Sequence, residues 1–357
     1  MSGINLYGQA LGPGELRRRV GRLEQVAGIE SFTYDDGPER GVRALRVRTG
    51  TGFAFTVLTD RGLDIGDAEF RGMALAWSSP TGVTGPWYYE PEGTGWLRSF
   101  HGGLVVTCGL QHAGGPSERE GEPLGMHGRV SNLPASHVAR PARWEDGGCV
   151  LEVRGQVRET RVFGNDLVLS RRITARVGES ILRIEDAVEN QGWSPAPLVM
   201  LYHINLGWPL LSEASRLVGP GAPGEPPEPH EPGAPEGSET WDRFAAPTRG
   251  FRQRSGYHRP RAGADGWAEA RLENPRLAGG LVLRVRFRPE ELPEFVQWTM
   301  TGEGTYVLGL EPATCRLHGY PAERRAGRII DLQPGETRRF SLEIHVEASE
   351  HHERKSA

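Results

Sequence analysis

The chain has 357 residues, with 42 Lys and Arg against 46 Asp and Glu, so its formal net charge of −4 lacks the basic surplus that a nucleic-acid partner requires. It contains no run of about 18 apolar residues and no basic-then-apolar leader, which predicts no membrane partner and a cytoplasmic location. Lys355 is the only lysine and stands near the end, so a lysine Schiff base, a pyridoxal-phosphate anchor and a phosphate-loop lysine are not expected.

Alternation of apolar and polar side chains with period two recurs along most of the chain and predicts β-strands. Residues 171–177 and 181–186 flank Gly178 and predict an antiparallel hairpin with charges on its outer face. Long amphipathic helices do not alternate with these segments, which counts against a doubly wound α/β fold and against a (β/α)-barrel. We therefore expect an all-β, mainly antiparallel fold. The predicted strands include residues 42–48, 52–57, 150–157, 167–177, 181–189, 281–287 and 340–346.

Three further segments bear on the domain organisation. Residues 13–26 place apolar side chains near a helical spacing and are either helical or irregular. Residues 219–237 are rich in Pro and Gly, which disfavour strand and helix interiors, and we interpret them as an exposed loop rather than an interdomain linker. The tail from about residue 347 is predicted to be a frayed end with solvated histidines. Residues 1–357 are thus predicted to form a single domain.

The three cysteines, Cys108, Cys149 and Cys315, stand singly and lack the close spacing of a zinc knuckle or a redox dithiol. We interpret them as buried hydrophobic residues in a reducing compartment.

Three features carry candidate chemistry. The first is a glycine-rich region that contains His101, His112 and His127, and the glycines around His127 predict that its ring lies on an exposed turn. The second is the apolar strand 198–209, where burial would bring the ionisation of His203 into a range useful for proton transfer. The third is Glu311, which ends an apolar strand directly before a proline and would project from a sheet edge.

Together these residues resemble a known family. Residues 126–128 (MHG), 202–206 (YHINL) and 310–312 (LEP), in this order, are similar to the signature sites of the galactose mutarotase (aldose 1-epimerase) superfamily. Residues 60–65 (DRGLDI), 100–110 (FHGGLVVTCGL) and 202–211 (YHINLGWPLL) are more similar still to a branch known only as a domain of unknown function, over roughly residues 19–346. The resemblance implies a β-supersandwich whose concave face holds a sugar.

The resemblance also implies roles. Glu311 would be the base that takes the proton from the anomeric hydroxyl, His203 the acid that protonates the ring oxygen, and His127 a hydrogen-bonding partner of the sugar. Such an acid and base must hold opposite protonation states, so His203 is expected to start protonated and Glu311 ionised. No metal and no cofactor are expected. The candidate substrate-binding residues are His127, Arg61, His101, Gln111, Asn205 and Arg129.

Two departures bear on the substrate. Tyr202 precedes the strand histidine where mutarotases carry asparagine, and Asn205 follows two residues later. Arg61 lies between two aspartates and either binds an acidic sugar through its guanidinium or pairs with Asp60 or Asp64 to fix a turn. Aromatic residues cluster nearby and could stack on a sugar or pack in a core; they are Trp77, Trp87, Tyr88, Tyr89 and Trp96.

The leading hypothesis is a carbohydrate epimerase acting at the anomeric carbon of a small-molecule sugar, either neutral or acidic. A second is a metal-dependent sugar isomerase, with its ion held by His101, His112, His127, His203 and Glu311. A third is a carbohydrate-binding module without turnover. The sequence does not name the sugar, its anomer or the oligomeric state.

Overall fold

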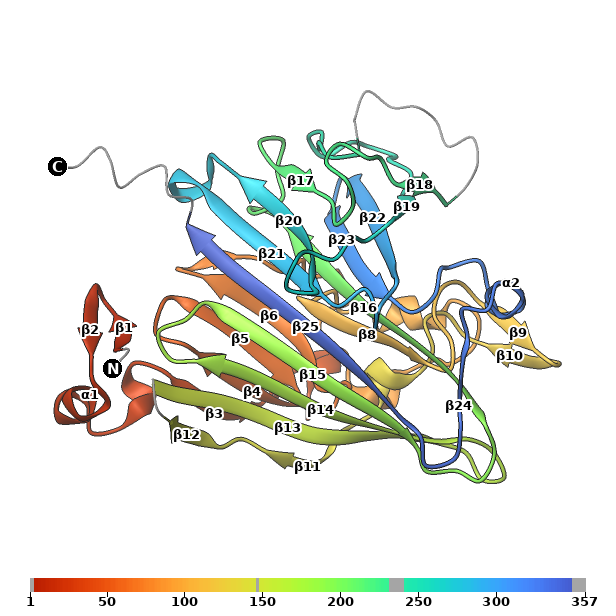
Figure 1. Cartoon of the computed structure of the whole chain (residues 1–357), viewed down its shortest axis with the longest axis horizontal. Coiled ribbons are helices and arrows are strands. Elements are labelled where there is room, and N and C mark those ends of the chain that lie inside the picture. The colour runs from red at the N-terminus through yellow and green to blue at the C-terminus, as the bar shows by residue number, and fades with distance from the viewer. Residues whose placement is uncertain (1–2, 146–147, 231–240, 349–357) are drawn as a thin grey trace.

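The computed structural model describes residues 3–145, 148–230 and 241–348, and within these ranges most of the chain forms antiparallel strands. Two large sheets of nine and twelve strands lie face to face (Figure 1). The prediction of an all-β, mainly antiparallel fold is confirmed.

The nine-stranded sheet forms one layer. Its central strands are long, and three of them follow one another directly in the sequence. The predicted hairpin is β14 and β15, joined through Gly178 at φ +88°. The strands in spatial order are β11 (Ser136–Ala139), β13 (Gly148–Thr160), β14 (Asp166–Arg176), β15 (Ile181–Asn190), β25 (Thr337–Ala348), β21 (Leu281–Phe287), β20 (Ala268–Asn274) and β17 (Arg216–Val218), with β12 (Ala142–Glu145) beside β13.

The twelve-stranded sheet forms the other layer and mixes strands from both halves of the chain. Its strands in spatial order are β18 (Glu228–Pro229), β19 (Arg254–His258), β22 (Glu294–Gly302), β23 (Thr305–Ala313), β16 (Ala196–Gly207), β8 (Val105–Leu110), β6 (Asp64–Phe70), β5 (Phe53–Leu58), β4 (Arg43–Arg48) and β3 (Gly28–Thr33), with β7 (Met73–Ala74) on β6 and β24 (Ile330–Leu332) on β16.

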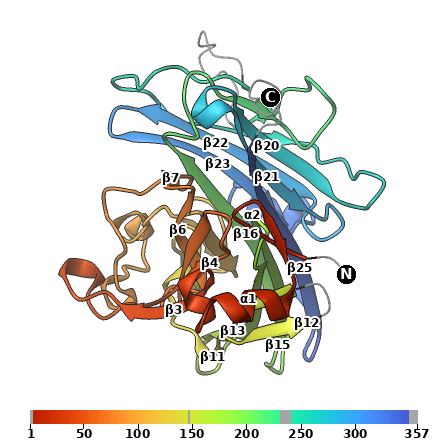
Figure 2. The same ribbon diagram turned by 90° about the vertical axis from the view of Figure 1, so that its left-hand side faces the viewer.

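The remaining elements lie at the ends of the sheets. In Figure 2 the short helix α1 (Pro13–Arg19) lies across the end of the molecule near β12, where Arg17 stacks on Trp144. At the opposite end in Figure 1 lie β9 and β10 beside α2. The bounds are β1 (Ile4–Leu6), β2 (Gln9–Leu11), β9 (Ser117–Arg119), β10 (Glu122–Leu124) and α2 (Tyr320–Arg325), and short 3-10 turns occur at Leu23–Gln25, Gly37–Glu39, Pro86–Tyr88, Gly95–Arg98, Val130–Asn132 and Leu277–Gly279.

Hydrophobic residues bury both faces of the twelve-stranded sheet at its centre. Along β16, Met200, Tyr202 and Ile204 belong to the core between the sheets, whereas Leu201 packs into a second core on the other face. Loops cover this second core and contribute Trp96 and Phe100 to it. Since successive strand residues point to opposite faces, His203 lies on the same side as Leu201. We call this side the loop-covered face.

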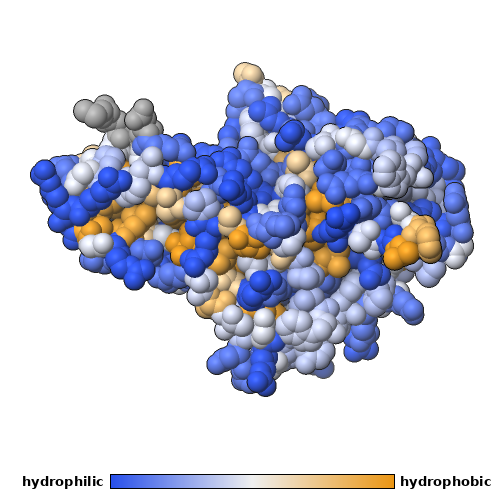
Figure 3. All heavy atoms as spheres, turned by 90° about the horizontal axis from the view of Figure 1, so that it is seen from below, coloured by the Kyte–Doolittle hydropathy of each residue, from blue (hydrophilic) through white to orange (hydrophobic). Residues whose placement is uncertain are grey.

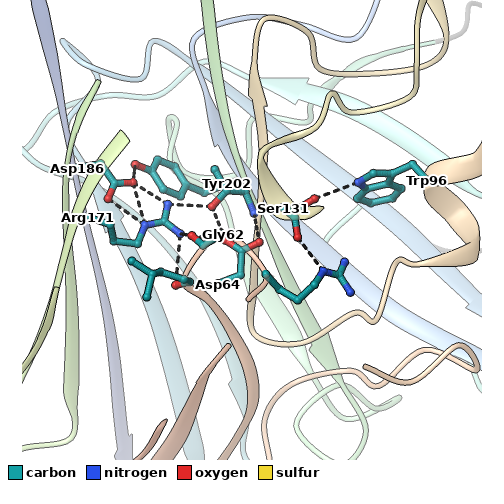
Figure 4. A network of polar contacts seen from close by, with 10 residues as sticks. Gly62, Asp64, Trp96, Ser131, Arg171, Asp186 and Tyr202 are labelled. Carbon is teal, nitrogen blue, oxygen red and sulfur yellow. Dashed lines mark hydrogen bonds and ion pairs between the residues drawn. The ribbon is translucent and has the colours of Figure 1, made fainter. Parts of the chain in front are cut away.

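A buried polar network links the two sheets (Figure 4). Arg171 on β14 contacts Asp186 on β15 and Asp64 on β6, at 2.7 and 2.9 Å, and all three side chains are fully buried. The hydroxyl of Tyr202 donates to Asp186 at 2.6 Å. Tyr202 is therefore held between the sheets, and this fixes its neighbour His203 on the loop-covered face. A charged pair this deeply buried is costly to break, by about 3–5 kcal/mol when one partner is removed.

Charged residues occupy much of the outer surface. The face in Figure 3 is largely hydrophilic, with hydrophobic residues in patches between hydrophilic ones. On the outer side of the nine-stranded sheet, ion pairs join neighbouring strands, such as Arg172 with Glu185 and Arg183 with Glu343. This agrees with the charged outer face predicted for the hairpin.

Local predictions differ in their outcome. All seven predicted strands are present, with bounds that agree within a few residues at each end, and all three cysteines are free and buried. Residues 13–26 form a helix only to Arg19; an extended Val20 and Gly21 then separate it from the 3-10 turn at Leu23–Gln25. Glycine weakens a helix, which explains the break.

The Pro-rich segment departs in part from its prediction, and the structure describes only the first residues of the predicted tail. Glu228–Pro229 forms the edge strand β18, so residues 219–237 are not entirely loop; an edge strand tolerates proline because no neighbour needs its missing N–H. Residues 231–237 lie outside the described residues. Strand β25 continues to Ala348, and the tail histidines at 351 and 352 lie outside the described residues. The single-domain arrangement stays a prediction.

Candidate active site on the twelve-stranded sheet

The two proposed catalytic residues lie on adjacent strands near the centre of the twelve-stranded sheet. The pairs Leu201 with Ala313 and Ile204 with Leu310 flank the position at which His203 on β16 faces Glu311 on β23. The expectation that Glu311 ends its strand at a sheet edge is wrong, because β23 pairs on both sides and continues through Pro312 to Ala313. Proline removes a ladder hydrogen bond, and the residue pairs between β16 and β23 accordingly skip Pro312 and Glu311.

The two side chains are in direct contact. His203 Nε2 lies 3.3 Å from Glu311 Oε1, and the residues are 5% and 1% exposed. Gly309, two residues before Glu311, gives the carboxyl its space, since a Cβ there would stand 2.7 Å from the same Oε1 atom. A glycine inside a strand marks such a close approach.

Burial sets the protonation of this couple. It raises the pKa of Glu311 to about 8 and lowers the pKa of His203 to about 4. At neutral pH these shifts favour one proton on the couple, held by Glu311, with His203 neutral. This is the reverse of the resting state expected from the sequence, because burial leaves neither charge solvated.

Aromatic rings surround His203. The ring centroids of Phe100 and Trp298 lie 5.2 and 5.3 Å from the His203 ring, both edge to face. Trp96 stacks on Phe100 at 4.3 Å, and Trp77 contacts both Phe100 and Trp298. Such rings desolvate the couple, and their apolar faces suit the C–H surface of a sugar.

His127 joins this group of rings. Its centroid lies 4.6 Å from Trp96 and 5.7 Å from His203, so its ring is half-buried rather than on an exposed turn. The Gly114 N–H donates to His127 Nδ1 at 3.3 Å. The neutral ring therefore carries its proton on Nε2, which leaves a donor for a ligand.

Arg61 does not face this group of residues. It is 1% exposed, and its guanidinium donates to the carbonyls of Thr84, Ser99 and Ser131, the latter two at 2.8 Å. Desolvation lowers its pKa to about 10. The prediction that Arg61 binds a sugar carboxylate is not supported, because its donors hold three loops together.

The two flanking aspartates also have other partners. The alternative prediction, in which Arg61 pairs with Asp60 or Asp64 to fix a turn, is therefore wrong in its choice of partners. Asp60 accepts from the backbone and side chain of Arg43, and Asp64 accepts from Arg171 and from Thr107. The motif at residues 60–64 thus ties together the strands and loops around the site.

The other predicted substrate-binding residues are dispersed. Asn205 is on the loop-covered face, but its Nδ2 donates to the carbonyls of Gly103 in a loop and of His203 in β16. Gln111 follows β8 and bridges Glu159 and Arg119, well beyond Val106, the β8 residue that faces His203. The remaining two are Arg129, which is exposed and lies over Tyr89, and His101, which is buried with both ring nitrogens unpartnered among the described residues.

The ligand set of the metal alternative is not gathered. Within the part of the chain that the structure describes, no three His, Cys, Asp or Glu side chains form a group that could hold a metal ion. His112 instead uses Nε2 to donate to the Gly115 carbonyl at 2.7 Å. No helix of the described chain is long and apolar enough to cross a membrane.

Sequence reasoning missed Phe100, Trp298 and Gly309. Gly309 carried a readable signal, because it interrupts an apolar strand two residues from a candidate catalytic carboxylate. Trp298 had none, since its place beside His203 depends on the pairing of β22 with β23. Of the predicted aromatic cluster, Trp77 and Trp96 are at the site, whereas Trp87 and Tyr88 are more than half exposed.

Comparison with known proteins places these features in a family. The model of the family described as a domain of unknown function, DUF4432, matches residues 39–346. No curated protein matches the sequence.

Solved structures share the fold. The chain is 27% identical to a Klebsiella pneumoniae protein provisionally described as an aldose 1-epimerase, with a TM-score of 0.82 over 89% of this chain and 83% of the other. A galactose mutarotase-like protein from Clostridium acetobutylicum (12% identity, TM-score 0.63, 91% and 100% covered) and the galactose 1-epimerase of Lactobacillus acidophilus (13%, 0.56, 90% and 99%) share the fold. The predicted galactose mutarotase-like architecture is confirmed.

Proposed function

The chain belongs to the DUF4432 domain family, and from this membership and the geometry of its site we propose that it is an aldose 1-epimerase-like enzyme that interconverts the anomers of a sugar. The observation that carries the proposal is the contact between His203 and Glu311, buried among aromatic rings and 3.3 Å apart. A buried acid–base couple with displaced pKa values is typical of a catalytic site.

The chemistry follows from one shared proton. Opening a cyclic hemiacetal requires removal of the proton on the anomeric hydroxyl and protonation of the ring oxygen, so that the bond from C1 to the ring oxygen breaks and C1 becomes a carbonyl. Rotation about the adjacent C–C bond and the reverse proton transfers close the ring on the other face.

The residues divide these steps between them. The shared proton passes from Glu311 to His203 Nε2, after which Glu311 takes the anomeric proton and His203 protonates the ring oxygen, the roles that the family resemblance implies. The Nε2–H of His127 is available to a sugar hydroxyl. Exclusion of water by Phe100 and Trp298 strengthens each of these electrostatic interactions.

The surroundings of the couple favour a neutral sugar over an acidic one. The rings of Phe100, Trp298 and His127 lie against His203 and carry no charge at neutral pH, and the guanidinium of Arg61 is bound to loop carbonyls. We therefore expect neutral sugars to raise the melting temperature more than phosphorylated or carboxylated ones in a thermal-shift panel.

Saturation-transfer NMR of an equilibrated sugar tests the function, because it measures exchange between anomers directly. We expect Glu311→Gln and His203→Asn each to slow exchange at least about a hundredfold, with the double variant little slower than either single one. Glu159→Gln and His258→Asn serve as controls, since each changes a buried residue of the same type elsewhere.

Parental exchange in folded Glu311→Gln and His203→Asn variants would disprove the assignment. Binding without exchange in the parent would instead favour a carbohydrate-binding module on the same sheet.

A further inference from the structure

Asn205 lies two residues beyond His203 on β16 and on the same face of the sheet. Its side chain is fully buried, and its Nδ2 donates to the carbonyls of Gly103 at 3.1 Å and His203 at 2.9 Å. Because Nδ2 is committed to these acceptors, the orientation of the amide is fixed. The Oδ1 atom can only accept a hydrogen bond.

Two buried polar atoms, one on each of these residues, lack a hydrogen-bond partner among the described residues. Asn205 Oδ1 and His203 Nδ1 have no hydrogen bond within the described chain. Buried polar atoms in folded proteins nearly always have a partner. The Nδ2 bond to the His203 carbonyl at 2.9 Å holds the Asn205 amide beside this residue, on the face that carries the imidazole.

The other ring nitrogen has a different neighbour. His203 Nε2 lies 3.3 Å from Glu311 Oε1 on β23, and the His127 ring approaches from the loop side. The hydrogen bond made by one ring nitrogen of a histidine decides which tautomer is present. Only a proton on Nδ1 leaves Nε2 free to accept the proton that Glu311 holds.

We propose that Asn205 Oδ1 accepts the Nδ1 proton of His203 and so fixes the tautomer whose Nε2 exchanges a proton with Glu311. This rests on the proposed function and makes Asn205 a positioning residue rather than a residue that binds the sugar. Its amide performs two tasks: Nδ2 holds the loop at Gly103, and Oδ1 orients the imidazole. Transfer of the proton between Glu311 Oε1 and His203 Nε2 leaves the Nδ1–H bond unchanged.

The tautomer can be read by NMR without any sugar. In protein with 15N-labelled histidine at pH 7, long-range 1H–15N spectra distinguish a protonated from an unprotonated ring nitrogen, and His203→Asn assigns the signal by its loss. We expect His203 to be neutral with its proton on Nδ1. A proton on Nε2 would overturn the proposal.

Two substitutions distinguish the role of Asn205 Oδ1 as a hydrogen-bond acceptor from the role of Nδ2 in holding the loop at Gly103. Asn205→Asp keeps an oxygen acceptor, whereas Asn205→Leu keeps only the approximate volume. We expect Asn205→Leu to lose the single tautomer and to slow anomer exchange at least about tenfold more than Asn205→Asp. Asn190→Leu is the matched control, since Asn190 is also fully buried and also donates to two carbonyls, those of Ser194 and Leu332.

Equal losses in Asn205→Asp and Asn205→Leu would mean that Asn205 only anchors the loop, and would overturn the proposal. Failure of the parent protein to exchange the anomers of any tested sugar would overturn the proposed function, yet the Nδ1 tautomer would still be measured. The two failures are therefore distinguishable.

Discussion

Replacing Gly309 by alanine tests the geometry of the acid–base couple without removing either member. The added Cβ would stand 2.7 Å from Glu311 Oε1 and 3.0 Å from the Cβ of Trp298, whereas ordinary contact begins at 3.4 Å. The end of the Glu311 side chain can move, but the Trp298 Cβ is fixed to the neighbouring strand. The carboxyl oxygen that contacts His203 therefore has to retreat.

The size of the effect follows from these distances. Restoring ordinary contact requires a shift of about 0.7 Å in Oε1, and a displacement of about 1 Å in a catalytic group can cost about a hundredfold in rate. We expect anomer exchange to fall by about tenfold to a hundredfold. Overpacking of the sheet at Trp298 should lower the free energy of unfolding by about 1–3 kcal/mol.

Saturation-transfer NMR measures the exchange rate, and thermal or denaturant unfolding measures the stability. Gly155→Ala is the matched control, because Gly155 is a strand glycine of the nine-stranded sheet, away from the couple. Its added Cβ would stand 3.0 Å from Leu63 and 3.1 Å from the Ser136 carbonyl. We expect this control to lose stability but to keep its exchange rate. A folded Gly309→Ala protein with the parental rate and pH profile would refute the reasoning.

Four further predictions concern titration, loop anchoring and domain organisation. The one-proton form of the couple exists between the His203 pKa of about 4 and the Glu311 pKa of about 8. We therefore expect kcat/KM to decrease at pH values below the first pKa and above the second, and we expect Glu311→Gln to lose the decrease at high pH. Because the pKa of Glu311 is raised on folding from 4.5, its contribution to stability is lost as pH rises toward 8. The melting temperature of Glu311→Gln relative to the parent should therefore be higher at pH 9 than at pH 5, and an equal difference at both values would contradict this. Arg61→Ala should lower the melting temperature and weaken the binding of neutral and anionic sugars alike. A selective loss of binding to anionic sugars would instead indicate that Arg61 recognises the ligand. Limited proteolysis should cut within residues 219–237 while the fragments stay together on gel filtration; their separation would argue for two domains.

The sequence by itself determined the strands, the fold class and the identity of the couple. Period-two alternation predicts strands because one face of each is buried, and this pattern is local enough to read at residues 167–177 and 181–189. His203 and Glu311 were identifiable because a polar side chain in an apolar strand is costly unless it has a use. Here the local pattern and the tertiary structure require the same residues.

Only the tertiary structure decided what surrounds the couple and what state it is in. Strand register brings Trp298 and Phe100 to His203, and register depends on pairings between residues distant in the chain. Arg61 looked like a ligand for an anion because its carbonyl partners, such as Ser131, lie far along the sequence. The proton resides on Glu311 for the same reason: desolvation is a property of the packed molecule, and no single strand carries it.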